Sequence, residues 1–139
     1  MDFILPNLAV GTHEEACGVP QDIDALLCVA AEKDLPGKLA VEHRVPLPDM
    51  QPIELALLRK AVNWIDEHIE SHRIMVYCNA GIGRSPSVVV AYLCAAGGLG
   101  YGEAVEKVAR SHPQMSTLPR LVEVTDELRA EWESRREDT

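Results

Sequence analysis

A cysteine and an arginine flank five small or apolar residues near the middle of the chain, in the stretch VYCNAGIGRSPS. Thiolates are strong nucleophiles and are favoured at helix N-termini and beside arginine. The loop between Cys78 and Arg84 has glycines at positions 81 and 83, which allow successive backbone N–H groups to face inward and form an anion nest. The planar guanidinium of Arg84 suits two oxygens of a phosphate. The stretch therefore predicts a site that binds a phosphate and attacks its phosphorus with Cys78.

The remaining roles fall to the loop backbone and to two side chains. The predicted phosphate cradle is the backbone of Asn79, Ala80, Gly81, Ile82 and Gly83, closed by Arg84. The hydroxyl of Ser85 is placed to hydrogen-bond the sulfur and to help expel the thiolate from a phosphocysteine intermediate. Asp49, in the proline-bounded stretch LPDMQP, is the candidate general acid that protonates the leaving oxygen and then activates water. The alternative for Asp49 is a solvated aspartate in a turn.

Strand and helix patterns alternate around this loop. Apolar runs predict an edge strand or hairpin at residues 3–11 and strands at 24–32, 39–47 and 73–77. Helical spacing predicts four helices: residues 54–70, Ser85 to the glycines at 97 and 98, 102–112, and 118–132. Ser85 is the candidate N-cap of its helix, with Pro86 at the first helical position. The predicted fold class is α/β: a three-layer sandwich with a central, mostly parallel sheet of about four or five strands flanked by helices. This order places Cys78 at the carboxyl end of a buried strand, where ligands bind in such folds.

Composition sets the remaining expectations. The 139 residues fit one domain, 1–139, with residues 133–139 as a frayed tail. A net charge of −9 argues against nucleic acid and anionic membranes as partners. The sequence shows no basic, apolar leader and no long apolar run, so we expect a cytoplasmic monomer with free thiols. The four cysteines and five histidines show no ligand spacing, so we expect no metal or other cofactor and place the histidines at the surface: His13, His43, His68, His72 and His112.

These residues resemble the cysteine-dependent protein tyrosine phosphatase superfamily, and the surrounding pattern resembles its small atypical dual-specificity branch. The segment CNAGIGRS matches the C-x5-R-[ST] signature, HRVPLPDMQP resembles the loop that carries the general-acid aspartate, and GIGRSPSVVVAYL matches the loop and its helix. The resemblance extends over nearly the whole chain. It implies that Cys78 is the nucleophile, Arg84 the phosphate clamp, Asp49 the general acid and base, and Ser85 the group that assists the thiolate. It also implies a phosphoprotein or a small aryl phosphate as substrate, with phosphotyrosine, phosphoserine and phosphothreonine all admitted.

Tyr77 departs from this pattern, because the family usually has histidine immediately before the cysteine. Tyrosine has no cationic form, so one hypothesis is that the Cys78 thiolate is stabilised less than in relatives. The apolar surroundings of Cys28 and Cys94 favour core positions. A minority interpretation makes Cys28 a resolving thiol that forms a disulfide with oxidised Cys78.

Two other classes of function remain open from the sequence. One is a catalytically weak module that recognises phosphate without cleaving its ester, which the presence of Cys78, Arg84 and Asp49 argues against. The other is a sulfur-transferring or arsenate-reducing enzyme, which can also use a cysteine and an anion loop. The five-residue spacing, Ser85 and the upstream aspartate favour a phosphatase.

Overall fold

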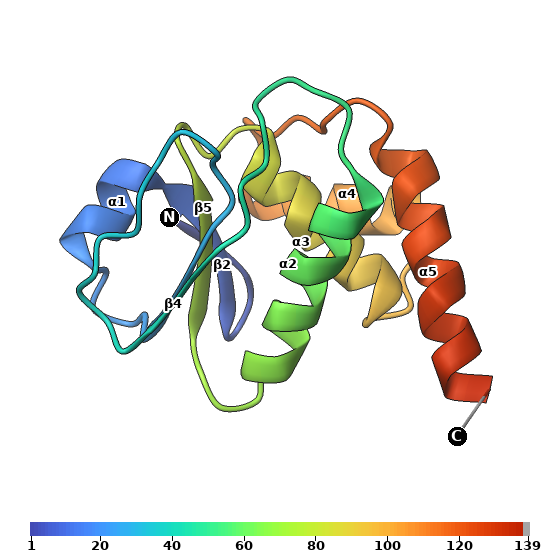
Figure 1. Cartoon of the computed structure of the whole chain (residues 1–139), viewed down its shortest axis with the longest axis horizontal. Coiled ribbons are helices and arrows are strands. Elements are labelled where there is room, and N and C mark those ends of the chain that lie inside the picture. The colour runs from blue at the N-terminus through green and yellow to red at the C-terminus, as the bar shows by residue number, and fades with distance from the viewer. Residues whose placement is uncertain (138–139) are drawn as a thin grey trace.

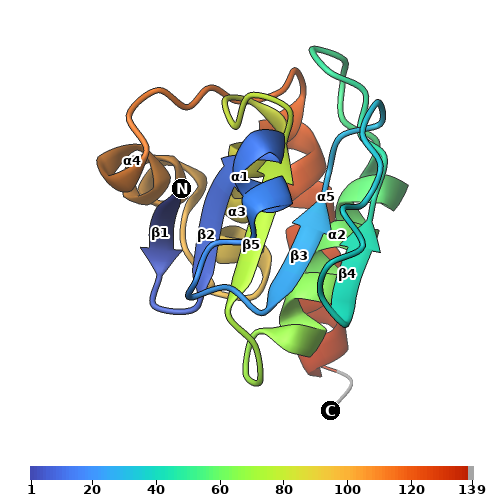
Figure 2. The same ribbon diagram turned by 90° about the vertical axis from the view of Figure 1, so that its left-hand side faces the viewer.

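A five-stranded sheet divides the computed structural model, which describes residues 1–137, into a thin and a thick helical layer (Figure 1). The strands lie in the order β1 (Asp2–Leu5), β2 (Leu8–Thr12), β5 (Ile74–Cys78), β3 (Ala25–Cys28) and β4 (Val41–Arg44). Only β1 is antiparallel to its neighbour, and the carboxyl ends of the other four share one edge (Figure 2). The short helix α1 (His13–Gly18) covers one face of the sheet. The other face carries α2 (Leu55–His68), α3 (Arg84–Ala95), α4 (Tyr101–Ser111) and α5 (Leu121–Glu137). The predicted α/β fold with a mostly parallel sheet is confirmed.

The central strand β5 is buried along its whole length, which explains its uninterrupted apolar sequence. The strands β3 and β4 exist where expected but are shorter than the predicted segments 24–32 and 39–47. Val29 and Ala30 stay buried after β3 has ended, so continuous apolarity overestimates the strand length. The predicted N-terminal hairpin is confirmed as the antiparallel pair β1 and β2.

Helix α3 is the centre of the thick layer, and all twelve of its residues are buried. It packs against β5 and β2 and against the other three helices of its layer, so no side of it needs to be polar. The prediction that Ser85 is its N-cap is wrong: the helix begins at Arg84 and Gly83 is the N-cap. The hydroxyl of Ser85 instead contacts the sulfur of Cys78, and Pro86 lies in the first turn, where a missing N–H is tolerated.

Helix α1 was not among the predicted elements. Thr12 and Glu15 form a capping box, because the Thr12 hydroxyl accepts from Glu15 N and the Glu15 carboxylate accepts from Thr12 N. The helix has only six residues, too few for an apolar periodicity to be visible.

Helix α5 packs one face onto the domain, and the predicted contact positions Leu121, Val124, Leu128 and Trp132 are buried. The helix continues to Glu137, so the expectation of a frayed tail is wrong for residues 133–137, while residues 138–139 lie outside the described part. Within residues 1–137 we find no helix that combines the length and apolarity needed to cross a membrane.

Candidate active site

Strand β5 ends at Cys78, and the chain then turns through residues 79–83 into helix α3, so the 78–84 loop lies at the carboxyl edge of the sheet. This turn depends on Gly81, whose φ is +70°, in the left-handed region that disfavours side chains. A Cβ at position 81 would also lie 2.9 Å from the carbonyl oxygen of Gly11 on β2. The loop is therefore pressed against the neighbouring strand at a point where only glycine fits.

The loop carbonyls are held from outside. Three hydrogen bonds do this: His13 N donates to Asn79 O (3.3 Å), His112 Nε2 to Gly81 O (2.5 Å) and Ser116 N to Ile82 O (2.8 Å). In a trans peptide the C=O and the following N–H point in opposite directions. The N–H groups of residues 80, 82 and 83 consequently turn toward the inside of the loop. The held carbonyls therefore orient three N–H groups of the predicted cradle, those of residues 80, 82 and 83, away from these partners.

Cys78 is buried at the base of this ring, and its Sγ lies 3.3 Å from Oγ of Ser85. Ser85 is itself fully buried in the first turn of α3, so its hydroxyl cannot exchange this contact for water. The predicted pairing of this hydroxyl with the sulfur is present. The N-terminal end of α3, with its unpaired N–H groups, faces the same sulfur.

Arg84 is 2% exposed and is held by a carboxylate that the sequence did not single out. Its Nη1 and Nη2 each donate to an oxygen of Glu32 at 2.6 Å, and Nη1 also donates to Leu47 O at 3.0 Å. This two-pronged ion pair lowers the pKa of Glu32 to about 2, mainly through the hydrogen bonds from Arg84, and the same bonds raise the pKa of Arg84. Glu32 thereby fixes the plane of the guanidinium.

The other edge of the guanidinium is left for a ligand. Nε of Arg84 is buried and has no hydrogen-bond partner among the described residues. A carboxylate oxygen of Asp49 lies 3.6 Å from this Nε, beyond hydrogen-bond distance but within reach of an ion pair. The Nε–H and the outer N–H of Nη2 share one edge, which matches the spacing of two phosphate oxygens. The orientation set by Glu32 therefore leaves this edge without a hydrogen-bond partner, with Asp49 beside it.

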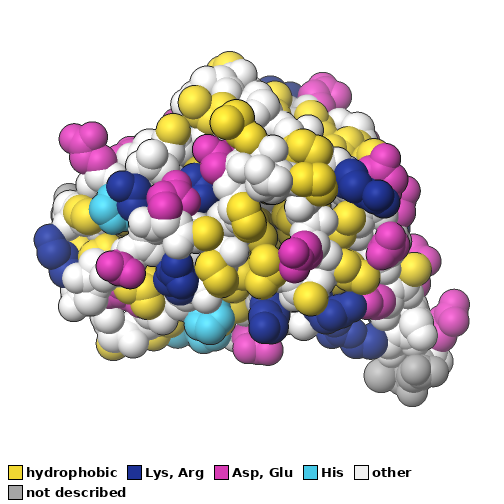
Figure 3. Space-filling model, turned by 45° about the horizontal axis from the view of Figure 1, so that its top comes forward, with side chains coloured by type: hydrophobic (Ala, Val, Ile, Leu, Met, Phe, Trp, Pro, Cys, Tyr) yellow, Lys and Arg dark blue, Asp and Glu magenta, His cyan; other side chains and the backbone are white. Residues whose placement is uncertain are grey.

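Arg84 and Asp49 both border a pocket of about 190 Å³. The pocket is lined by Asp49, Met50, Cys78, Asn79, Ala80, Ile82, Gly83 and Arg84. Asp49 is 57% exposed and Met50 is 80% exposed, so the side formed by the Asp49 loop is open to solvent. Arg84 is the one cation of this lining, and basic and acidic side chains are interspersed on the face in Figure 3. The site is suited to a single phosphate group.

The surface placement predicted for the histidines is wrong for His112. This side chain follows α4, is 4% exposed and contacts both Gly81 O and a carboxylate oxygen of Asp2. Its partners lie 31 and 110 residues away in the sequence, which is why no local pattern indicated it. Among residues 1–137 no group of three or more His, Cys, Asp or Glu side chains is arranged to hold a metal ion.

Tyr77 and Cys28 lie on the face of the sheet opposite to the Cys78 sulfur. The two residues are register partners on β5 and β3, and register partners of parallel strands share a face while the next residue points to the other. Burial, together with the nearby thiol of Cys28, raises the pKa of Tyr77, whose hydroxyl has no hydrogen-bond partner among the described residues. Because the two thiols lie on opposite faces of adjacent strands, a direct Cys28–Cys78 disulfide would require the strands to rearrange, and the arrangement does not support Cys28 as a resolving thiol.

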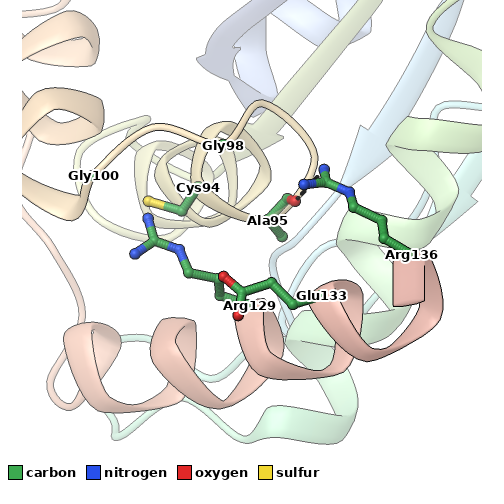
Figure 4. Close-up of a pocket in the computed structure, with 7 residues that line it drawn as sticks. All are labelled: Cys94, Ala95, Gly98, Gly100, Arg129, Glu133 and Arg136. Atoms are coloured by element: carbon green, nitrogen blue, oxygen red, sulfur yellow. Dashed lines mark hydrogen bonds between the residues drawn. The ribbon is translucent and has the colours of Figure 1, made fainter. Parts of the chain in front are cut away.

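A second cavity, of about 300 Å³, lies between the end of α3 and helix α5 (Figure 4). Arg136 donates to the carbonyls of Ala95 and Ala96, and Arg129 donates to that of Leu99. These carbonyls are at or just beyond the C-terminus of α3, where cations are favoured. The cavity contains none of the predicted site residues, and its arginines serve to cap α3.

The fold and the 78–84 loop together define a cysteine-based phosphatase domain. The sequence model of the family described as "Dual specificity phosphatase, catalytic domain" matches residues 10–125. The chain belongs to this family. A search of curated proteins returned no match.

Solved structures agree with this assignment. The structure of Tk-PTP in the active form is 29% identical, with a TM-score of 0.78, and the alignment covers 92% of this chain and 95% of that chain. Human DUSP28 is 21% identical, with a TM-score of 0.82 and coverage of 97% and 99%. The human tyrosine phosphatase-like serine/threonine/tyrosine-interacting protein is 23% identical, with a TM-score of 0.82 and coverage of 95% and 97%. The two human proteins share the fold at this level of identity.

Proposed function

We propose that this domain hydrolyses phosphomonoesters on phosphoproteins through a phosphocysteine intermediate on Cys78. The supporting observation is the convergence of three features on one pocket: the Cys78 sulfur, the inward N–H groups of the 78–84 loop, and the free Nε edge of Arg84. A phosphate held by these donors lies beside the Cys78 sulfur, because Cys78 lines the same pocket. Charge that develops on the phosphoryl oxygens is met by donors already in place.

The reaction proceeds in two displacements. The Cys78 thiolate attacks phosphorus, the bond to the ester oxygen breaks, and Asp49 donates a proton to the leaving oxygen. Water then attacks the phosphocysteine while Asp49 accepts its proton, and the P–S bond breaks to release inorganic phosphate. The Ser85 hydroxyl donates to the departing thiolate. Asp49 borders the same pocket as Cys78, on a loop open enough to admit a protein-bound ester.

The substrate class follows from the depth and charge of the pocket. Its exposed rim does not enclose an aromatic ring, so phosphoserine and phosphothreonine reach the sulfur as well as phosphotyrosine does. Its single arginine offers little to a ligand with several phosphate groups. We therefore propose dual specificity toward singly phosphorylated side chains.

Release of phosphate from para-nitrophenyl phosphate and from phosphorylated peptides tests this proposal. Wild-type protein should turn over both substrates, and Cys78→Ser should abolish turnover while retaining the fold. Cys17→Ser is the matched control, because Cys17 lies on α1 outside the pocket. Binding of phosphopeptide without turnover by the wild type would instead identify a recognition module. Sulfur transfer from thiosulfate would identify the other rival class.

A further inference from the structure

His112 joins the N-terminal strand to the 78–84 loop. Its Nδ1 lies 2.6 Å from a carboxylate oxygen of Asp2 on β1, and its Nε2 lies 2.5 Å from Gly81 O. His112 is 4% exposed and its contact with Gly81 O is buried, whereas the Asp2 side chain is 38% exposed. Among the described residues, His112 is the one side chain that donates to a carbonyl of the loop, since those of Asn79, Ile82 and Gly83 accept from backbone N–H groups.

Both partners of the ring are acceptors. A peptide carbonyl has no proton to offer, and neither does a carboxylate, so each short contact needs an N–H from the imidazole. The contact with Gly81 O therefore requires an N–H on Nε2 of His112. The Asp2 carboxylate, in contact with Nδ1, orients the ring toward Gly81.

The bond to Gly81 O sets the orientation of the peptide between residues 81 and 82. Gly81 has a φ of +70°, and glycine resists rotation of an adjacent peptide less than any other residue. If this peptide turned over, the Gly81 carbonyl would face the bound phosphate and the N–H of Ile82 would face away. A donor in the cradle would then be replaced by an acceptor that repels the anion.

We propose that His112, held by Asp2, is a positioning residue that keeps the Gly81–Ile82 peptide in its phosphate-binding orientation. This inference rests on the proposed function of the 78–84 loop. The device is independent of the residue before the cysteine, because Tyr77 lies on the opposite face of the sheet and makes no hydrogen bond to the loop. Because Asp2 lies on β1, the orientation of the loop also depends on the pairing of β1 at the edge of the sheet.

Three variants test the proposal. His112→Ala removes both ring contacts, His112→Gln keeps one amide N–H for Gly81 O, and Asp2→Asn removes the carboxylate while keeping an acceptor of the same size. The matched control is Arg110→Ala, which removes an exposed ion pair with Glu106 on the same helix without touching the loop.

Two measurements are made on each variant. The first is kcat and KM for para-nitrophenyl phosphate. The second is the affinity of inorganic phosphate for the same variant combined with Cys78→Ser, which reads the cradle without chemistry. Deleting an oxyanion donor outright lowers kcat by about 100- to 1000-fold, so a misdirected one should lower it by about 10-fold. We expect about that loss in kcat and in phosphate affinity for His112→Ala, a smaller loss for Asp2→Asn, partial recovery in His112→Gln, and no change in Arg110→Ala.

The outcomes separate the two proposals. An inactive wild type would contradict the proposed function, and the phosphate-affinity measurement would then decide the role of His112 alone. An active wild type with unchanged kcat and phosphate affinity in His112→Ala would overturn the inference. Thermal unfolding of every variant identifies a general loss of structure. If His112→Ala does not fold, equal kcat and phosphate affinity in wild type, His112→Gln and Asp2→Asn would likewise overturn it.

Discussion

Glu32 and Arg84 form a two-pronged ion pair across 52 residues of sequence, with both N–O distances at 2.6 Å. The arginine is almost completely buried, whereas the Glu32 side chain is 46% exposed. A half-exposed carboxylate contributes modestly to stability because water screens it. Its larger effect is geometric, because it occupies one edge of the guanidinium and leaves the other edge facing the pocket.

Replacing Glu32 by glutamine should therefore reduce catalysis more than stability. The amide keeps the size of the side chain but can accept only one of the two N–H bonds, so the guanidinium gains freedom to rotate away from the phosphate. We expect kcat/KM for para-nitrophenyl phosphate to fall by about 10-fold, as for a donor held less firmly. Glu67→Gln on the exposed side of α2 is the control. Equal kcat/KM values in both variants would show that Glu32 does not orient Arg84 for catalysis.

The same ion pair predicts that the free energy of unfolding decreases at acidic pH. The pKa of Glu32 is lowered from 4.5 to about 2 in the folded protein. A carboxylate whose pKa is lowered by folding stabilises the folded state at pH values above its pKa in the unfolded chain. That contribution is lost as the pH falls from about 4.5 toward 2. Urea unfolding of wild type and Glu32→Gln across this range should show a shallower pH dependence in the variant. Parallel curves would contradict the prediction.

Asp49 should matter more for poor leaving groups than for good ones. A general acid is needed most when the leaving oxygen is strongly basic. Asp49→Asn should therefore lower kcat about 100-fold for phosphoserine peptides and much less for para-nitrophenyl phosphate, whose leaving group is a stable anion. Asp34→Asn, on a loop outside the pocket, is the control. An equal loss on both substrates would leave Asp49 as a neighbour of Arg84 rather than a proton donor.

Local sequence was enough to predict the segment from Cys78 to Ser85, but not the distant residues that hold it in place. The nucleophile, cradle, clamp and Ser85 occupy eight consecutive residues, and their chemistry depends on a single strand–loop–helix turn. Glu32 ended an apolar run and looked like the end of a strand. Its partnership with Arg84 depends on how β3 and β5 lie side by side, and this arrangement is a property of the sheet.

The ends of the strands also depend on contacts that local sequence does not reveal. The apolar runs indicated the hairpin and the other three strands, and for β3 and β5 the reason is burial on both faces of the sheet. They did not indicate where β3 ends, because Val29 and Ala30 remain buried beyond its last residue and Val29 N still donates to Tyr77 O. His112 could not be recognised as buried, because its partners come from β1 and from the loop.

Tyr77 gives a test of how the thiolate is stabilised. Its hydroxyl is buried without a partner, so Tyr77→Phe should leave the pH–rate profile unchanged and raise the free energy of unfolding by about 1 kcal/mol. Tyr77→His introduces a group that can carry positive charge one residue before Cys78 but on the opposite face of the sheet, so the acidic limb of the profile should move only slightly to lower pH. If the limb does not move in Tyr77→His, the residue before the cysteine has no part in activating the thiol of this chain.

Gly81 and Gly37 separate backbone strain from steric contact. Both have a φ of +70°, but a Cβ at position 81 would meet Gly11 O at 2.9 Å, whereas one at position 37 would meet nothing within 4 Å. Gly37→Ala should lose about 1 kcal/mol of stability from the left-handed conformation alone and keep full activity. Gly81→Ala should lose more stability and most of its turnover, because the loop must move off β2 and misalign its donors. Urea unfolding and kcat of the two variants check this. A similar stability loss in both, with normal kcat in Gly81→Ala, would show that the loop tolerates displacement from the strand.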